Sequence, residues 1–128
     1  GEAAKLLDVE AEWIAEHRLQ AVRLLVEATG AVALLKGRDT LVLSPEGQLA
    51  IRALDSASLA TAGSGDVLAG IIGACMARGA DSWTAAIGGA AAHVQSARTA
   101  TVARRGGAII AGDLIEHLQV LGRPGSTL

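Results

Sequence analysis

Three small residues and one acid stand directly before an apolar segment in the run 59–70, Leu-Ala-Thr-Ala-Gly-Ser-Gly-Asp-Val-Leu-Ala-Gly. Gly63, Ser64 and Gly65 allow a ligand to approach the backbone closely, and the unpaired N–H groups at the start of a helix favour an anion there. Asp66 falls in the first helical turn, where its carboxylate could accept a proton from a hydroxyl beside a phosphate. The run therefore indicates phosphoryl chemistry.

Ordinary helix capping gives a similar pattern, because an acid in the first turn complements the helix dipole and Gly or Ser often precedes a helix. Spacing alone does not separate the two interpretations. Two other phosphate-binding motifs are disfavoured. The run lacks the final Gly-Lys-Ser/Thr of a Walker A loop, and it lacks the third glycine of a dinucleotide fingerprint.

Length and composition are those of one globular domain that binds small molecules. The 128 residues are 51% hydrophobic, which is ample for a core, but only 2% are aromatic. The net charge is −2 and the pI is about 5.9, so nucleic acid is not an expected partner. The pair Arg104-Arg105 is expected to be solvated rather than part of a basic patch.

The sequence predicts neither a membrane span nor a metal site. No apolar stretch reaches the ~20 residues that a spanning helix needs. His17, His93 and His117 lack metal-ligand spacing with one another or with Cys75, and helix-surface or packing roles are expected for them. As the only cysteine, Cys75 can form no internal disulfide; we expect it to be buried, and we expect the protein to be cytoplasmic.

Apolar spacing and turn residues predict the elements of the first half of the chain. A helix is expected over residues 11–29, closed by Gly30, and a strand buried on both faces over residues 31–35. Segments 40–43 and 48–52 flank Ser-Pro-Glu-Gly, which predicts a hairpin. Residues 53–62 have weak periodicity and are expected to form a loop.

Three helices are expected in the second half. The first covers residues 64–78, with Cys75 on its inward face, and Gly79 closes it. The second, for which Asp81-Ser82 offers an N-cap, runs to about residue 98, and Gly88 and Gly89 are expected to permit close approach of a neighbouring helix. Its expected buried face consists of small residues: Ala86, Ala90, Ala91, Val94 and Ala97. The third covers residues 111–121, with Asp113 complementing its dipole.

The order helix, strand, hairpin, helices is typical of an α/β layer arrangement. A strand buried on both faces needs parallel neighbours, and the chain offers none for residues 31–35. The sequence also starts without Met. Residues 1–128 are therefore expected to be the C-terminal part of a single domain whose N-terminal half is missing.

Four segments in the same order resemble the ADP-dependent NAD(P)H-hydrate dehydratases, a ribokinase-like family often fused to an NAD(P)H-hydrate epimerase. They are Gly1-Glu2 with Leu6-Leu7, Leu35-Lys-Gly-Arg-Asp-Thr40, the run 59–70, and Ala111-Gly-Asp-Leu-Ile-Glu116. The resemblance covers almost the whole chain. It implies the C-terminal portion of a ribokinase-like three-layer αβα sandwich, arranged around an anion-hole loop.

The resemblance also implies roles for individual residues. The adenine nucleotide would contact Lys36, Gly37, Arg38, Asp39, Thr40 and Gly65. Asp66 would contact the hydrated nicotinamide and act as the base, while the backbone N–H groups of Ala62, Gly63, Ser64 and Gly65 would form the anion hole. ADP, or ATP, would be the co-substrate with Mg²⁺, and the products would be NADH or NADPH, AMP and phosphate.

Two other functions stay open. A ribokinase-like kinase for a sugar or a vitamin precursor would use the same base and anion hole. Alternatively, the chain could be a non-catalytic fragment whose open sheet edge drives self-association into a homo-oligomer.

Overall fold

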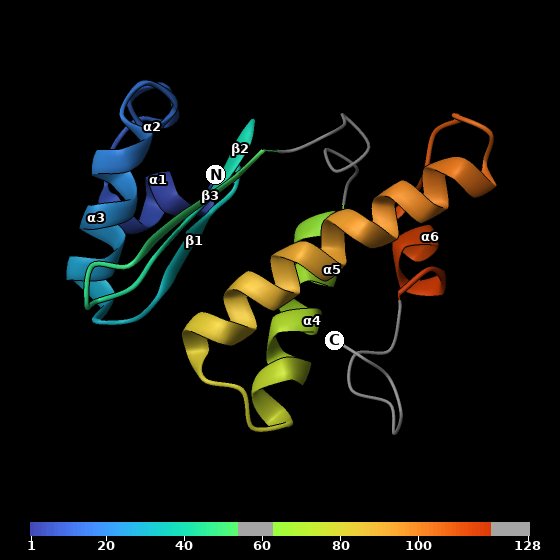
Figure 1. Cartoon of the computed structure of the whole chain (residues 1–128). Helices are drawn as coiled ribbons and strands as arrows, with labels where there is room; N and C mark the ends of the chain where they lie inside the picture. Colours follow the sequence, from blue (N-terminus) through green and yellow to red (C-terminus); the bar gives the residue numbers. More distant parts are fainter. Residues whose placement is uncertain (54–62, 119–128) are drawn as a thin grey trace. The chain divides into compact units, whose positions relative to one another are not determined.

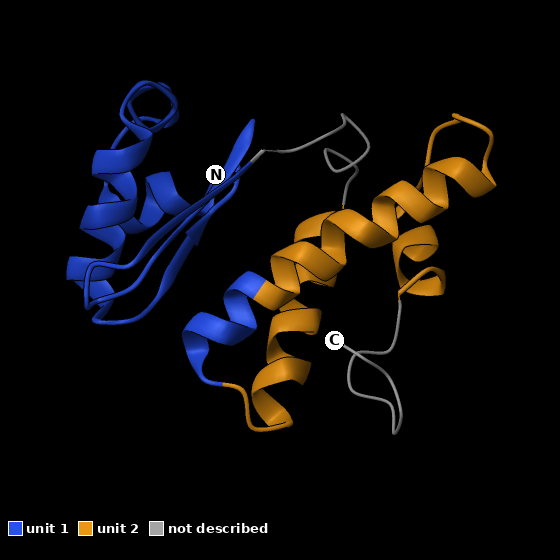
Figure 2. Cartoon of the chain, in the orientation of Figure 1, with its two compact units in different colours: residues 1–54, 81–87 blue, residues 55–80, 88–128 orange. Residues whose placement is uncertain are grey.

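The structure is a computed structural model that describes residues 1–53 and 63–118. It falls into two compact units (Figure 2). Unit 1 comprises Gly1–Leu54 and Asp81–Ile87, and unit 2 comprises Asp55–Ala80 and Gly88–Leu128. No helix in the described ranges is long and apolar enough to cross a membrane.

Unit 1 combines short helices with a small sheet (Figure 1). Its elements are α1 (Glu2–Leu7), α2 (Ala11–Glu16), α3 (Arg18–Thr29), β1 (Ala33–Leu35), β2 (Asp39–Leu43) and β3 (Leu49–Ala53). The strands lie in the order β1-β2-β3, and both neighbouring pairs are antiparallel. Helix α3 packs on β1 and β2, so the expected α/β class is confirmed.

The hairpin β2-β3 is confirmed at the expected place. Its register pairs Leu43 with Leu49 and Leu41 with Ile51. The Ser44 N–H donates to the Gln48 carbonyl at 2.9 Å, and the Gly47 N–H donates to the Ser44 carbonyl at 3.0 Å. These bonds close the turn that Pro and Gly predict.

The core of unit 1 lies between α3 and the sheet. Alternation along the strands directs Leu35, Leu41 and Leu43 to the face that α3 covers. The buried cluster consists of Ile14, Ala21, Val22, Leu25, Val26, Leu35, Leu41 and Leu43. On the same face of the sheet, β3 carries Leu49 and Ile51, which stay exposed at 41% and 61%.

The helix expected over residues 11–29 is interrupted at His17. This residue has φ −130° and ψ 47°, which ends α2, and α3 starts at the next residue. The His17 ring stacks on Trp13 with centroids 4.7 Å apart, and its Nδ1 lies 2.9 Å from the Trp13 carbonyl oxygen. These local contacts stabilise the break, which the apolar spacing does not reveal. Gly30 ends α3 with φ 67°, as expected.

The expectation of a strand buried on both faces over residues 31–35 is wrong. Strand β1 has three residues, and only Leu35 is buried, while Ala33 and Leu34 are partly exposed. Within residues 1–53 and 63–118, β1 pairs with β2 alone. The apolar run therefore forms a half-covered strand of an antiparallel sheet.

Unit 2 is helical in its described part. Its elements are α4 (Ser64–Ala77), the later turns of α5 (Ser82–Ala103), and α6 (Ala111–Glu116), which contacts α4. Helix α5 extends five residues beyond the expected end at residue 98, and α6 ends before the expected residue 121. Leu68 and Ile71 of α4 are buried, but Cys75 is only half-buried, contrary to expectation.

The N-terminus of α5 is capped as expected, because Asp81 Oδ1 accepts the Thr84 N–H at 2.7 Å. The expected buried small-residue face is confirmed for Ala86, Ala90 and Ala97, whereas Val94 is only half-buried and Ala91 is exposed. The buried face also includes His93 and Ser96. Close approach is confirmed at Gly89 alone of the two glycines: a Cβ there would lie 2.6 Å from Ile72 Cγ1, whereas Gly88 has open space.

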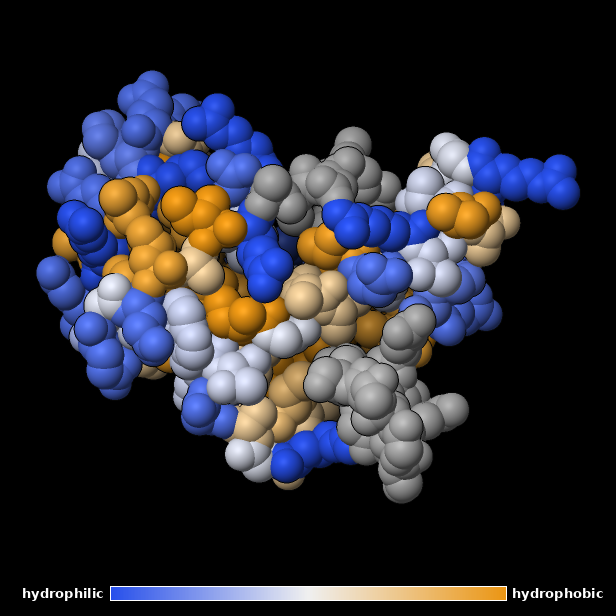
Figure 3. All heavy atoms as spheres, in the orientation of Figure 1, coloured by the Kyte–Doolittle hydropathy of each residue, from blue (hydrophilic) through white to orange (hydrophobic). Residues whose placement is uncertain are grey.

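Several large apolar side chains reach the surface of both units. Figure 3 shows hydrophobic residues lying among hydrophilic ones on the face in view. The exposed apolar side chains are Leu6, Leu19, Leu49, Ile51, Met76, Val102, Ile110 and Ile115. Since single exposed apolar residues are normal in proteins, most of them need no functional explanation.

Candidate functional site

The glycine-rich run leads into α4, and glycine serves as the N-cap. Gly63 has φ 82° and ψ −4°, a left-handed conformation that non-glycine residues rarely adopt. Because Gly63 has no side chain, it cannot cap the first N–H groups of α4 as Ser or Asp would. Of the expected anion-hole residues, Gly63, Ser64 and Gly65 are described, and Ala62 lies outside the described residues.

Asp66 lies in the first turn of α4 and is exposed, as is Gly65, whereas Ser64 is buried. An exposed carboxylate beside N–H groups without a side-chain cap can reach a bound ligand. The N-cap position is occupied by Gly63, so the acid is not the N-cap of this helix. An acid in the first turn after a glycine N-cap also agrees with the capping interpretation, so the arrangement is compatible with both interpretations of Asp66.

Helix α6 packs behind the start of α4. A Cβ built at Gly63 would lie 3.3 Å from the Cβ of Ala111, the first residue of α6. Gly63 is thus constrained twice, by its backbone conformation and by the close approach of α6. The position of α6 therefore leaves little space for a side chain at position 63.

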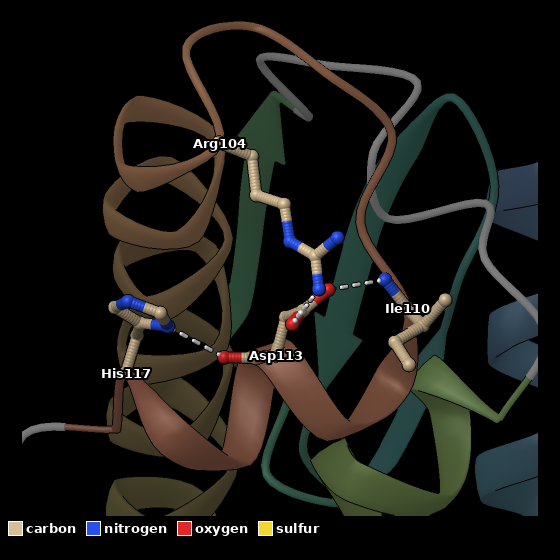
Figure 4. A network of polar contacts seen from close by, with 4 residues as sticks. All are labelled: Arg104, Ile110, Asp113 and His117. Atoms are coloured by element: carbon tan, nitrogen blue, oxygen red, sulfur yellow. Dashed lines mark hydrogen bonds and ion pairs between the residues drawn. The ribbon is translucent and has the colours of Figure 1, made fainter.

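An ion pair fixes the start of α6 (Figure 4). Arg104 Nη2 donates to Asp113 Oδ1 at 2.8 Å, and the Ile110 N–H donates to Asp113 Oδ2 at 2.8 Å. The Asp113 side chain is 7% exposed. His117 adds a contact from its Nδ1 to the Asp113 carbonyl oxygen at 2.8 Å.

These contacts give Asp113 more than the dipole role that its sequence position suggests. The Ile110 N–H, followed by the Arg104 guanidinium, holds the pKa of the Asp113 carboxyl below its ordinary value. Arg104 is half-exposed and ion-paired, so the expectation of a simply solvated pair is wrong for this residue. The sequence contains no local signal for a pair separated by nine residues across a turn.

The second group of expected site residues forms the turn between β1 and β2. Lys36 follows β1 directly and is partly buried, Gly37 and Arg38 are exposed, and Asp39 and Thr40 begin β2. Burial lowers the pKa of the Lys36 ammonium, and the charge of Glu2 opposes that shift. A phosphate near Lys36 would favour its charged form.

The Arg18 side chain binds the backbone of this turn through hydrogen bonds. Its Nη1 donates to the Lys36 carbonyl at 3.3 Å, and its Nη2 donates to the carbonyls of Leu35, at 3.3 Å, and Asp39. Sequence reasoning missed Arg18. A signal was available, because a cation in the first turn of a helix opposes the helix dipole and suggests a partner elsewhere.

The structure thus brings the expected site residues together in two groups. Residues 36–40 share one turn of unit 1, and residues 63–66 share the start of α4 in unit 2. The histidines take the expected places on helices or at their ends. His93 is buried, while His17 is exposed and His117 partly exposed. In the described ranges, no three residues among His, Cys, Asp and Glu gather as a metal site.

Comparison with known proteins gives one family. The model of a family described as NAD(P)H-hydrate dehydratase matches residues 1–119. The match covers both groups of expected site residues. The family is ribokinase-like, in agreement with the fold expected from the resemblance.

Individual relatives carry related names. Over 92 residues the chain is 45% identical to the ADP-dependent (S)-NAD(P)H-hydrate dehydratase of Neisseria meningitidis, covering 72% of this chain and 31% of the relative. It is 40% identical over 118 residues to the bifunctional NAD(P)H-hydrate repair enzyme Nnr of Moorella thermoacetica, and the match covers 92% of this chain and 22% of that enzyme. For the Escherichia coli enzyme of that name, the identity is 36% over 124 residues, and the match covers 97% of this chain and 24% of that enzyme. The chain thus spans less than a third of the length of these relatives.

Proposed function

The chain belongs to the NAD(P)H-hydrate dehydratase family, and we propose that the protein containing it restores NADH or NADPH from the hydrated forms while converting ADP to AMP and phosphate. The start of α4 carries this proposal. There, exposed Asp66 stands in the first turn of a helix whose N-cap is a glycine. This arrangement provides a general base beside N–H groups that can stabilise a phosphate.

In the proposed reaction, Asp66 accepts the proton of the hydroxyl that hydration added to the nicotinamide ring. The hydroxyl oxygen attacks the terminal phosphorus of ADP, and the bond from that phosphorus to the bridging oxygen breaks, which releases AMP. The N–H groups from residue 62 to residue 65 stabilise the charge on the transferred phosphoryl group. Phosphate then leaves with the ring C–O electrons as an adjacent ring C–H loses its proton to solvent and the double bond forms again.

Residues 36–40 are proposed to bind the adenine nucleotide. The partly buried Lys36 can place a positive charge on a phosphate, while Thr40 and the turn backbone can supply hydrogen bonds. The name of the Neisseria relative, which specifies ADP, supports ADP as the co-substrate.

Mg²⁺ is proposed to enter with the nucleotide. The described residues contain no group of three or more acidic, His or Cys side chains that would form a complete protein site. Mg²⁺ usually keeps several waters and binds substrate phosphates with only one or two carboxylates. We propose that the nucleotide phosphates supply most of the ligands of this ion.

The proposal extends to an epimerase partner, because two of the relatives are named bifunctional repair enzymes. We propose that an NAD(P)H-hydrate epimerase is fused to this protein or acts beside it. Homo-oligomerisation also stays a proposal; the exposed apolar side chains of Leu49 and Ile51 on strand β3 support it. Sedimentation equilibrium of the full-length protein tests that point.

The activity is tested with the protein expressed from its full open reading frame. Hydrated NADH and ADP are mixed with the protein, and recovery of the reduced-nicotinamide absorbance is followed, together with AMP and phosphate. Absorbance should recover only when ADP is present. No recovery, combined with nucleotide-dependent phosphorylation of a sugar or vitamin precursor, would support the kinase alternative instead.

A further inference from the structure

Arg18 is the first residue of α3, and its side chain crosses to the turn between β1 and β2. The guanidinium donates to three backbone carbonyls, those of Leu35, Lys36 and Asp39. The β1-β2 ladder ends at the pair Leu35 and Leu41, so the carbonyl of Lys36 lies beyond the ladder. The sheet therefore holds only the two ends of this turn, at Leu35 and Asp39, and Arg18 also binds the carbonyl of Lys36 between them.

Arginine suits this position better than other residues. The guanidinium is planar and always charged, and it presents five donors in a fixed arrangement that several oxygens can share. Immobilising so long a side chain costs conformational entropy. A cation at the first position of α3 also opposes the dipole of that helix. The contacts with the turn offset both costs.

Gly37 makes room for this contact. A Cβ at Gly37 would lie 2.1 Å from Arg18 Nη1 and 2.7 Å from Arg18 Cζ. The φ of Gly37 is not among the positive values, so its backbone conformation is open to alanine. The absence of a side chain at position 37 is therefore needed for the passage of the guanidinium and not for the backbone conformation.

We infer that Arg18 is a positioning residue for the nucleotide: it holds residues 36–40 in the conformation that binds ADP, and Gly37 is a glycine because Arg18 passes there. The inference rests on the proposed function of this turn. Arg18 acts through the backbone carbonyls, so no contact between Arg18 and the nucleotide is required. A turn held in its binding conformation loses less entropy when the ligand binds.

The test compares the full-length protein with Arg18→Met and with a matched control. Arg23→Met removes an exposed arginine from the same helix. Calorimetry with AMP should give a Kd about tenfold higher for Arg18→Met, which corresponds to about 1.4 kcal/mol, and an unchanged Kd for Arg23→Met. The KM for ADP should rise similarly while kcat at saturating ADP stays within about twofold. Arg18→Lys should give an intermediate Kd, because one ammonium cannot reach all three carbonyls.

A double-mutant cycle tests the role of Gly37. Gly37→Ala is expected to displace the flexible end of the Arg18 side chain and to change little else. If Arg18→Met fails to fold, Gly37→Ala can therefore replace it as the test variant. Gly37→Ala should weaken AMP binding in the presence of Arg18 and have almost no further effect in Arg18→Met. An equal loss in both backgrounds would mean that Gly37 acts on the nucleotide directly, and it would overturn the inference about Gly37.

The outcomes separate this inference from the proposed function. If the unmodified protein binds AMP and Arg18→Met binds it equally well, Arg18 has no positioning role, while the proposed function stands. If the unmodified protein binds neither AMP nor ADP, both are overturned. A fall in melting temperature for Arg18→Met with an unchanged Kd well below that temperature would show a purely structural role, which also contradicts the inference.

Discussion

The two segments proposed to bind the substrates keep their shapes by different means. Residues 36–40 are held by a long side chain, Arg18, which donates to the carbonyls of the turn. The conformation at Gly63 depends on a missing side chain, because φ 82° strains other residues and a Cβ would lie only 3.3 Å from the Cβ of Ala111. Residues 36–40 thus depend on hydrogen bonds, which other donors can replace, whereas Gly63 depends on a steric limit. The two should therefore respond differently to substitution.

The comparison also concerns chemistry, because we assign the base to the α4 segment and nucleotide affinity to the turn. Asp66→Asn should lower turnover at least ~100-fold and leave the Kd for AMP unchanged, since the base is lost and the N–H groups stay. Absorbance recovery and calorimetry on the same preparation measure both quantities. Asp81→Asn alters a capping acid on α5 and serves as a control. Near-normal turnover of Asp66→Asn would remove Asp66 as the base.

Lys36→Gln should show the opposite behaviour. Removing the charge should raise the Kd for ADP about tenfold, while kcat at saturating ADP stays near normal. Lys5→Gln, at an exposed position of the same unit, should leave both values unchanged. A loss of kcat without a change of Kd would place Lys36 in catalysis and break the division between the two segments.

Gly63→Ala tests the steric limit. Alanine in the left-handed region costs about 1 to 2 kcal/mol, and the new Cβ would also press on Ala111. Gly30→Ala is the matched control, because Gly30 has φ 67° and open space around a Cβ. Denaturant unfolding should show a larger loss for Gly63→Ala than for Gly30→Ala. Equal losses would mean that α6 does not constrain position 63.

The ion pair between Arg104 and Asp113 is expected to give the smallest effect, which is a change in how stability depends on pH. The folded-state pKa of Asp113 is depressed, so its stabilisation is complete above the unfolded value of about 3.9 and is lost as pH falls through the folded value. The melting temperature of Asp113→Asn should therefore be lower than normal at pH 7, and the difference should shrink below about pH 4. Glu116→Gln, an exposed acid on α6, should show a smaller change. A difference that is constant with pH would contradict this assignment.

Local signals in the sequence predicted much of the fold. Pro45 and Gly47 mark the hairpin, Gly30 ends α3, and Asp81 caps α5, because each of these features depends on neighbouring residues alone. The break at His17 was missed, because a ring stacked on Trp13 stabilises it without disturbing the apolar spacing. The apolar run at β1 was misjudged for a related reason: burial depends on which partner covers a strand.

The candidate site shows the same division. The residues at 36–40 and 63–66 were proposed as site residues because their types and order resemble those of a known family, and their roles stay predictions. The residues that hold them were not found: Arg18 precedes its turn by 17 or more positions, and Arg104 reaches Asp113 across a change of direction. A cation in a first helical turn can suggest that a partner exists, but which carbonyl or carboxylate it meets is known only from the folded chain.

The contact between Arg18 and Gly37 has a consequence for the evolution of this family. If the glycine exists to let the guanidinium pass, the two positions are not independently variable. A lineage that replaces the arginine by a shorter residue would release position 37, and alanine or serine could then spread there without penalty. The reverse order, in which the glycine changes first, would meet purifying selection. We therefore expect the two positions to covary, with loss of the arginine preceding loss of the glycine along each branch.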